Sequence, residues 1–165
     1  MMGHVWVRVM DWMLADNEPP MPAAGSILKR VGLRVRGDVS LADFDSPDSI
    51  VRLGSGAPHE VTYRLTGQPG QPRDFYFDAG PAGEHGGAEF LLTVDTGRFQ
   101  VQTDAMARDL PVAGRVAVTG KLSVVGQYEW DDFELEDARA EWFVRAVVPL
   151  DGGDVMVDLT PTPEA

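Results

Sequence analysis

The chain has 165 residues, of which 14 are Lys or Arg and 26 are Asp or Glu, giving a formal net charge of −12 at pH 7. Such an acidic surface repels phosphate, so nucleic acid and anionic membranes are unfavourable partners, and the absence of cysteine excludes disulfides, thiolate metal ligands and cysteine nucleophiles. The length and the 44% content of hydrophobic residues predict one globular domain over residues 1–165.

The N-terminal segment predicts a strand rather than a targeting signal. Valines alternate with other residues over positions 5–9, which is the period of a half-buried strand. Arg8 and Asp11 interrupt the apolar residues, and no small-residue cleavage site follows. No window of the chain approaches the run of about 18 apolar residues that a membrane span needs. We therefore expect a cytoplasmic protein that does not cross a membrane.

The same period-2 alternation recurs along the chain and predicts about eight or nine strands. The alternating segments are Val5 to Val9, Val31 to Val35, Val61 to Leu65, Phe75 to Phe77, Phe90 to Val94, Phe99 to Val101, Val116 to Val124, Trp142 to Val148 and Val155 to Leu159. Residues 95–97 (Asp-Thr-Gly) and 151–153 (Asp-Gly-Gly) predict tight hairpins between successive segments. The Pro- or Gly-rich stretches 17–24, 67–72 and 79–87 predict irregular connections.

Helical signals are few. Residues 103–110 are compatible with one or two helical turns, with Thr103 or Asp104 as the N-cap. Residues 131–141 are compatible with a helix, or with a strand or acidic loop that leads into Trp142. Residues 41–50 stay unassigned, although Ser-Pro-Asp at 46–48 predicts a turn.

Closely spaced strands with one or two short helices predict an all-β fold. Both an antiparallel barrel and a two-sheet sandwich satisfy this pattern. We expect Val118, Leu122, Trp142 and Val144 to be buried together in one core.

The densest charge cluster lies between Glu129 and Asp137, where six carboxylates surround aromatic residues. Aromatic side chains ringed by charge are common in protein interfaces. We expect an exposed face that docks a basic protein partner; its residues are Glu129, Trp130, Asp131, Asp132, Phe133 and Glu134. The alternative is an ordinary solvated face. A calcium loop is disfavoured because the run lacks the glycine that an EF-hand turn requires.

A second candidate site is basic. Arg30, Arg34 and Arg36 alternate with apolar residues, which places them on one face of a predicted strand. Guanidinium groups in a line suit a carboxylate, a phosphate or nucleic acid. Cross-strand pairing with acidic neighbours is the alternative interpretation.

Sequence motifs for catalysis and cofactor binding are missing. The chain has no phosphate-binding loop, no GxGxxG, no nucleophile elbow and no HExxH. His4, His59 and His85 do not form a chelating pattern, so we expect no metal site and no cofactor.

We therefore expect a non-catalytic protein-binding domain without catalytic residues. One alternative is a small-ligand-binding or hydrolytic enzyme with a carboxylate and aromatic pocket in a β-barrel. A second is an OB-like nucleic-acid binder, which the net charge disfavours.

Two short segments carry a resemblance. Val5-Trp6-Val7, followed by Asp11-Trp12, resembles the start of an actinobacterial all-β family of unknown function, whose members begin with a VWV strand and a nearby Asp-Trp. Three residues separate Val7 from Asp11, which departs from the family spacing. Residues 114–125, with Tyr128 beyond them, are similar to the early strands of five-stranded OB-type barrels. The first resemblance implies an all-β fold and supplies no site residue, since that family has no assigned function.

Overall fold

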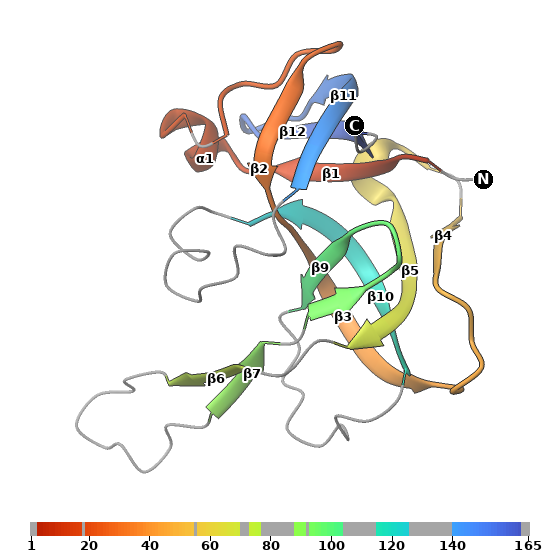
Figure 1. The fold of residues 1–165 in the computed structure, drawn as a ribbon. Coiled ribbons are helices and arrows are strands. Elements are labelled where there is room, and N and C mark those ends of the chain that lie inside the picture. The colour runs from red at the N-terminus through yellow and green to blue at the C-terminus, as the bar shows by residue number, and fades with distance from the viewer. Residues whose placement is uncertain are drawn as a thin grey trace.

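The structure is a computed structural model that describes residues 3–17, 19–54, 56–69, 73–76, 88–91, 93–103, 115–125 and 140–162. Within these residues the chain forms twelve strands, one short α-helix and one turn of 3-10 helix (Figure 1). The predicted all-β fold is confirmed. None of the helices in the described part of the chain is long and apolar enough to cross a membrane.

The strands follow the alternating segments of the sequence. In chain order the elements are β1 (Val5–Val9), α1 (Asp11–Ala15), β2 (Ile27–Val31), β3 (Leu33–Ala42), β4 (Ser49–Leu53), the 3-10 helix η1 (Pro58–Glu60), β5 (Thr62–Pro69), β6 (Arg73–Tyr76), β7 (Ala88–Leu91), β8 (Thr93–Asp95), β9 (Gln100–Thr103), β10 (Arg115–Val124), β11 (Ala140–Pro149) and β12 (Val155–Pro161). The count exceeds the predicted eight or nine for three reasons: β4 was not predicted as a strand, residues 31–35 belong to the two strands β2 and β3, and residues 90–94 belong to the two strands β7 and β8.

Ten strands form one sheet in the order β2-β11-β12-β1-β10-β3-β9-β8-β5-β4, and β6 pairs with β7 separately. An additional pairing joins β10 to β5, so the pairings among β10, β3, β9, β8 and β5 close on themselves. Two pairs, β1 with β10 and β3 with β9, are parallel. The expectation of a purely antiparallel sheet is therefore wrong. Period-2 alternation is the same in both arrangements, so it does not specify the direction of a neighbouring strand.

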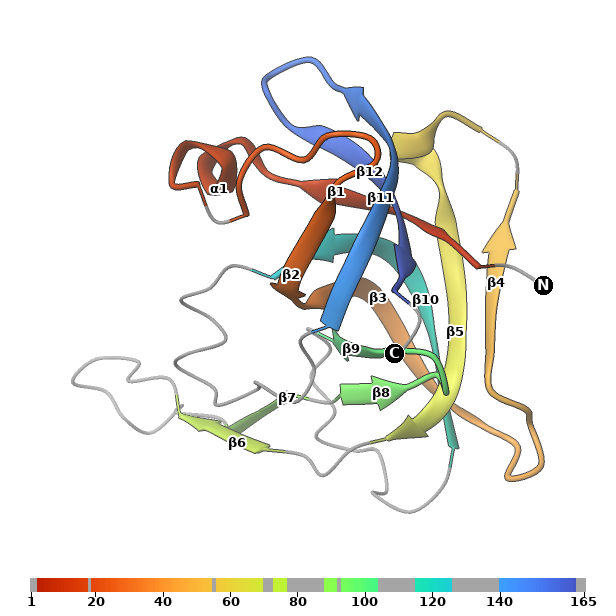
Figure 2. The ribbon, with the colours of Figure 1, turned by 45° about the horizontal axis from the view of Figure 1, so that its top comes forward.

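The long strands β3 and β10 touch through two facing glycines, Gly37 and Gly120. A Cβ atom on Gly37 would lie 1.7 Å from the backbone oxygen of Thr119, and one on Gly120 would lie 2.0 Å from that of Arg36. β10 also pairs with β5 over residues 116–120 and with β1 at residues 122 and 123. Figure 2 shows β5 and β10 curving across the molecule.

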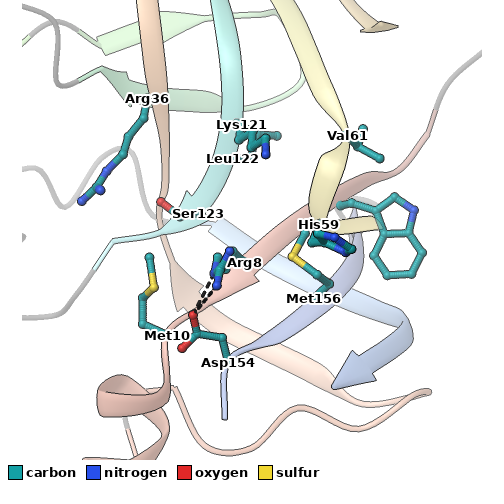
Figure 3. Close-up of a pocket in the computed structure, with 11 residues that line it drawn as sticks. Arg8, Met10, Arg36, His59, Val61, Lys121, Leu122, Ser123, Asp154 and Met156 are labelled. Atoms are coloured by element: carbon teal, nitrogen blue, oxygen red, sulfur yellow. Dashed lines mark hydrogen bonds and ion pairs between the residues drawn. The ribbon is translucent and has the colours of Figure 1, made fainter. Parts of the chain in front are cut away.

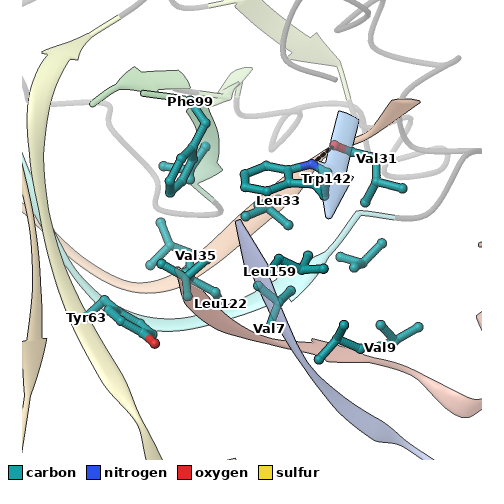
Figure 4. Packing of buried hydrophobic residues seen from close by; sticks show 14 of the residues in the cluster. Val7, Val9, Val31, Leu33, Val35, Tyr63, Phe99, Leu122, Trp142 and Leu159 are labelled. Carbon is teal, nitrogen blue, oxygen red and sulfur yellow. Dashed lines mark hydrogen bonds between the residues drawn. The ribbon is translucent and has the colours of Figure 1, made fainter. Parts of the chain in front are cut away.

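The core lies on the inner face of the sheet and contains the four residues predicted for it. Val118, Trp142 and Val144 are 0% exposed and Leu122 is 2% exposed. The Trp142 ring meets Phe99 edge to face, with 5.1 Å between the ring centroids. Its indole nitrogen donates a 2.8 Å hydrogen bond to the backbone oxygen of Val31 (Figure 4). The largest side chain of the core is therefore packed and has its polar atom satisfied.

Both predicted hairpins are confirmed. The 95–97 turn joins β8 to β9, and the 151–153 turn joins β11 to β12. The described residues of 17–24 are irregular, as expected, whereas residues 67–69 continue β5 instead of forming a loop. The candidate helices fall largely on residues 104–110 and 131–139, which lie outside the described residues.

Candidate binding pocket

The outer face of the sheet gathers polar side chains from strands that are distant in sequence. On β1 the odd-numbered valines enter the core, so Arg8 points to the opposite face. The register places Arg8 beside Ser123 of β10 on one side and beside Met156 of β12 on the other. One strand further along, Lys121 of β10 pairs with Arg36 of β3. The pairing of these strands therefore brings Arg8, Lys121 and Arg36 onto one surface.

A pocket of about 310 Å³ opens on this face (Figure 3). It is bounded by β1, β3, β10, the beginning of β12, and the segment around η1. Its lining residues are Trp6, Arg8, Met10, Arg36, His59, Val61, Lys121, Leu122, Ser123, Asp154 and Met156. The volume lies at the lower end of the range for small-molecule sites, which is roughly 300–1,000 Å³.

Arg8 and Asp154 form the best-defined polar contact of the pocket. The Nη2 and Nε atoms of Arg8 lie 2.7 and 2.8 Å from Oδ2 of Asp154. The other carboxylate oxygen accepts a 2.7 Å hydrogen bond from the backbone N–H of Asp11. This N–H and the Arg8 guanidinium hold the pKa of Asp154 below its usual 3.8. Asp154 is therefore an ionised carboxylate with both oxygens engaged, and it fixes the position of Arg8.

The turn before β12 depends on glycine at the same point. Gly153 has a φ of +98°, and a Cβ atom there would lie 2.5 Å from Oδ1 of Asp11. Glycine adopts this conformation without steric cost, whereas other residues are strained in it. Gly153 thus allows Asp154 to reach both Arg8 and the backbone of Asp11.

The opposite wall is held by a contact between β1 and β5. The backbone N–H of Trp6 donates a 2.8 Å hydrogen bond to the hydroxyl oxygen of Tyr63. Tyr63 is 1% exposed, and burial raises the pKa of its phenol, so it stays neutral at physiological pH. Nearby, Pro58 begins the 3-10 helix that carries His59 to the pocket. The His59 side chain is about half exposed.

The charge of the pocket is opposite in sign to that of the chain. Arg8, Arg36 and Lys121 contribute three permanent positive charges, and Asp154 contributes one negative charge, so the lining residues sum to 3 − 1 = +2 with His59 neutral. The whole chain carries −12. Apolar surface from Trp6 and other lining side chains stands beside these charges. This combination suits a ligand that has both an anionic group and an apolar part.

The predicted basic residues are only partly brought together. Arg34 and Arg36 lie on β3, and Arg36 lines the pocket. Arg30 lies on β2, which pairs with β11, so the three arginines do not share one strand. Gly32 separates β2 from β3, whereas the apolar alternation continues through this position and predicts a single strand.

The predicted acidic face, Glu129 to Glu134, lies outside the described residues and stays a prediction. Sequence reasoning missed Arg8, Lys121 and Asp154 as pocket residues. A signal was present for two of them, because Arg8 and Lys121 occupy outward positions of strongly alternating strands. Among the described residues, no group of three or more His, Asp or Glu side chains is placed to hold a metal ion.

No protein-family model, curated protein or solved structure matches the chain. The resemblances at the N-terminus and at residues 114–125 therefore stay predictions. The function has to be argued from the pocket itself.

Proposed function

We propose that the protein is a non-catalytic binding domain whose pocket takes a small ligand with an anionic group and an apolar or aromatic part. The observation that carries this proposal is a local charge of +2 around an apolar-walled cavity in a chain of net charge −12. In this arrangement Lys121 attracts the anion, while Trp6 and Met156 contact the apolar part. The closed ring of strand pairings supports a barrel as the scaffold that holds these strands.

Binding is favoured over hydrolysis by the state of the pocket carboxylate. Among the described lining residues only Asp154 carries one, whereas glycoside hydrolysis uses a pair. A general base works best when its pKa lies near the operating pH. The pKa of Asp154 is lowered, and both its oxygens already accept hydrogen bonds. Asp154 therefore has a structural role in orienting Arg8.

Phenyl phosphate is a suitable probe because it joins an aromatic ring to an anion. We expect it to quench the fluorescence of Trp6 and to bind more tightly than benzyl alcohol, which has no charge, or benzyltrimethylammonium, which has the opposite charge. Equal binding of all three compounds would show that the cationic side chains do not select the ligand.

The two lysines of the chain, Lys121 and Lys29, provide a matched pair of variants. Both are exposed, but only Lys121 lines the pocket. Lys121→Gln is expected to weaken phenyl phosphate binding about three- to fivefold, the value of one exposed ionic contact. Lys29→Gln removes the same charge from a different surface and is expected to leave the affinity unchanged. Equal losses in the two variants would indicate a response to net charge alone.

A second candidate function is docking of a basic protein through residues 129–137, favoured by the net charge of −12. Such a contact should associate faster at low salt. With the partner in hand, charge reversal at Asp131 and Asp132 should slow association more than it speeds dissociation. An association rate that changes neither with salt concentration nor with these charge reversals would contradict this second function.

A further inference from the structure

The connection between β3 and β4 presents an aromatic side chain to solvent. The backbone N–H of Ser46 donates a 2.9 Å hydrogen bond to the backbone oxygen of Asp43, which closes a turn with Phe44 and Asp45 at its tip. Phe44 is 88% exposed, the highest value among the large hydrophobic side chains of the described residues. Asp43 and Asp45 on either side of it are exposed as well. The turn therefore displays a phenyl ring between two carboxylates.

This chemistry is complementary to the pocket. The pocket offers an apolar wall and the positive charge of Lys121. An apolar cavity of roughly 150 Å³ holds a benzene molecule in another protein. A pocket of about 310 Å³ therefore has room for the ring of Phe44, and a flanking carboxylate could then pair with Lys121.

The turn and the pocket of one chain are too far apart to meet. Arg36 and Ala42 lie on the same strand, β3, six residues apart. At about 3.3 Å per residue an extended strand covers roughly 20 Å over that distance. Figures 1 and 2 also show the β3–β4 connection at the end of the molecule remote from β1 and β12. A turn of this kind can fill the pocket only in another copy of the chain.

We propose that Asp43-Phe44-Asp45 of one copy docks into the pocket of a second copy, so that the protein self-associates through a head-to-tail contact. The proposal rests on the proposed function, because it uses the same pocket and the same ligand chemistry. Head-to-tail contacts join two different surfaces and produce rings or open chains. The like net charges of the two copies oppose the contact, so association is expected only at high protein concentration.

Analytical ultracentrifugation of the full chain tests the proposal. The weight-average mass of the wild type should rise above the 18.0 kDa of the monomer as concentration increases. Phe44→Ala, which removes the ring, and Lys121→Glu, which reverses a pocket charge, should each stay monomeric. Val51→Ala is the control for Phe44, because Val51 is a second exposed apolar residue, on β4 rather than in the turn. It should associate like the wild type.

A mixture of the two monomeric variants gives the sharpest outcome. Phe44→Ala retains an intact pocket and Lys121→Glu retains an intact turn, so together they should form a species of twice the monomer mass and nothing larger. Phenyl phosphate in excess should dissociate this species, because it occupies the same pocket. A mixture that stays monomeric, or a Phe44→Ala variant that associates like the wild type, would overturn the head-to-tail contact.

The same variants separate the two proposals. At protein concentrations where the wild type is monomeric, Phe44→Ala should bind phenyl phosphate as tightly as the wild type, since Phe44 does not line the pocket of its own chain. A wild type that binds phenyl phosphate but stays monomeric at every concentration would refute self-association alone. A wild type that associates but does not bind phenyl phosphate would refute the proposed function, and with it the docking of the turn in this pocket.

Discussion

Replacing Trp142 with alanine tests whether the core described above holds the fold together. The ring is 0% exposed, packs against Phe99, and donates a hydrogen bond to Val31. Burying an aromatic side chain of about 150–250 Å² at about 25 cal/mol per Å² gives about 4–6 kcal/mol. The variant also leaves the Val31 carbonyl without its donor, whereas relaxation of the cavity recovers part of the loss. Core aromatic truncations accordingly cost about 3–5 kcal/mol, which is the loss we expect.

Urea unfolding followed by circular dichroism measures this loss as a shift in midpoint at constant slope. Phe143→Ala is the control, because Phe143 is the next residue on β11 and is 38% exposed. It should cost about 1 kcal/mol or less. A loss below about 1 kcal/mol for Trp142→Ala would contradict the burial of the ring and leave Trp142 available for binding.

Three further predictions concern the pocket and its supports. Asp154→Asn should lower the free energy of unfolding by about 1 kcal/mol at neutral pH, measured by urea unfolding; the loss is modest because the ion pair with Arg8 is partly exposed. The folded-state pKa of Asp154 is lowered, so in the wild type the stabilisation from its carboxylate is complete above pH 3.8 and is lost as the pH falls through the lower folded-state value. Gly120→Ala should cost about 1–3 kcal/mol, because the added Cβ meets the backbone oxygen of Arg36, and equal stability would contradict the close strand crossing. Because burial raises the pKa of Tyr63, the stabilisation that its neutral phenol gives the folded state is complete below pH 10.0 and is lost as the pH rises through the higher folded-state value. Tyr63→Phe should therefore make the stability fall less steeply at alkaline pH.

Much of the local structure was predictable because one face of most strands is buried. Alternation of apolar residues identified strands such as β1, β10 and β12, and the glycine turns at 95–97 and 151–153 identified two hairpins. The core positions of Trp142 and Val144 followed from the same alternation. These features depend on residues that are near one another in the sequence.

The arrangement of the strands and the pocket could not be predicted in the same way. The parallel pairing of β1 with β10 places Arg8 beside Ser123, more than a hundred residues further along the chain. Period-2 alternation says which face a side chain occupies and does not name its neighbour across the sheet. Sequence reasoning therefore emphasised Arg36, which lies in a visible run of arginines, and passed over Lys121, which pairs with it through register alone.

The binding of an anionic aromatic ligand in the pocket is tested most directly by nuclear magnetic resonance on the isotopically labelled protein. Titration with phenyl phosphate should move the indole N–H signal of Trp6 and the backbone signals of Arg8, Ser123 and Met156, which lie on the three strands β1, β10 and β12 and all line the pocket. Benzyl alcohol at the same concentration should produce smaller shifts of these signals. Shifts that are absent from these residues, or that cluster in another part of the chain, would contradict the proposed site.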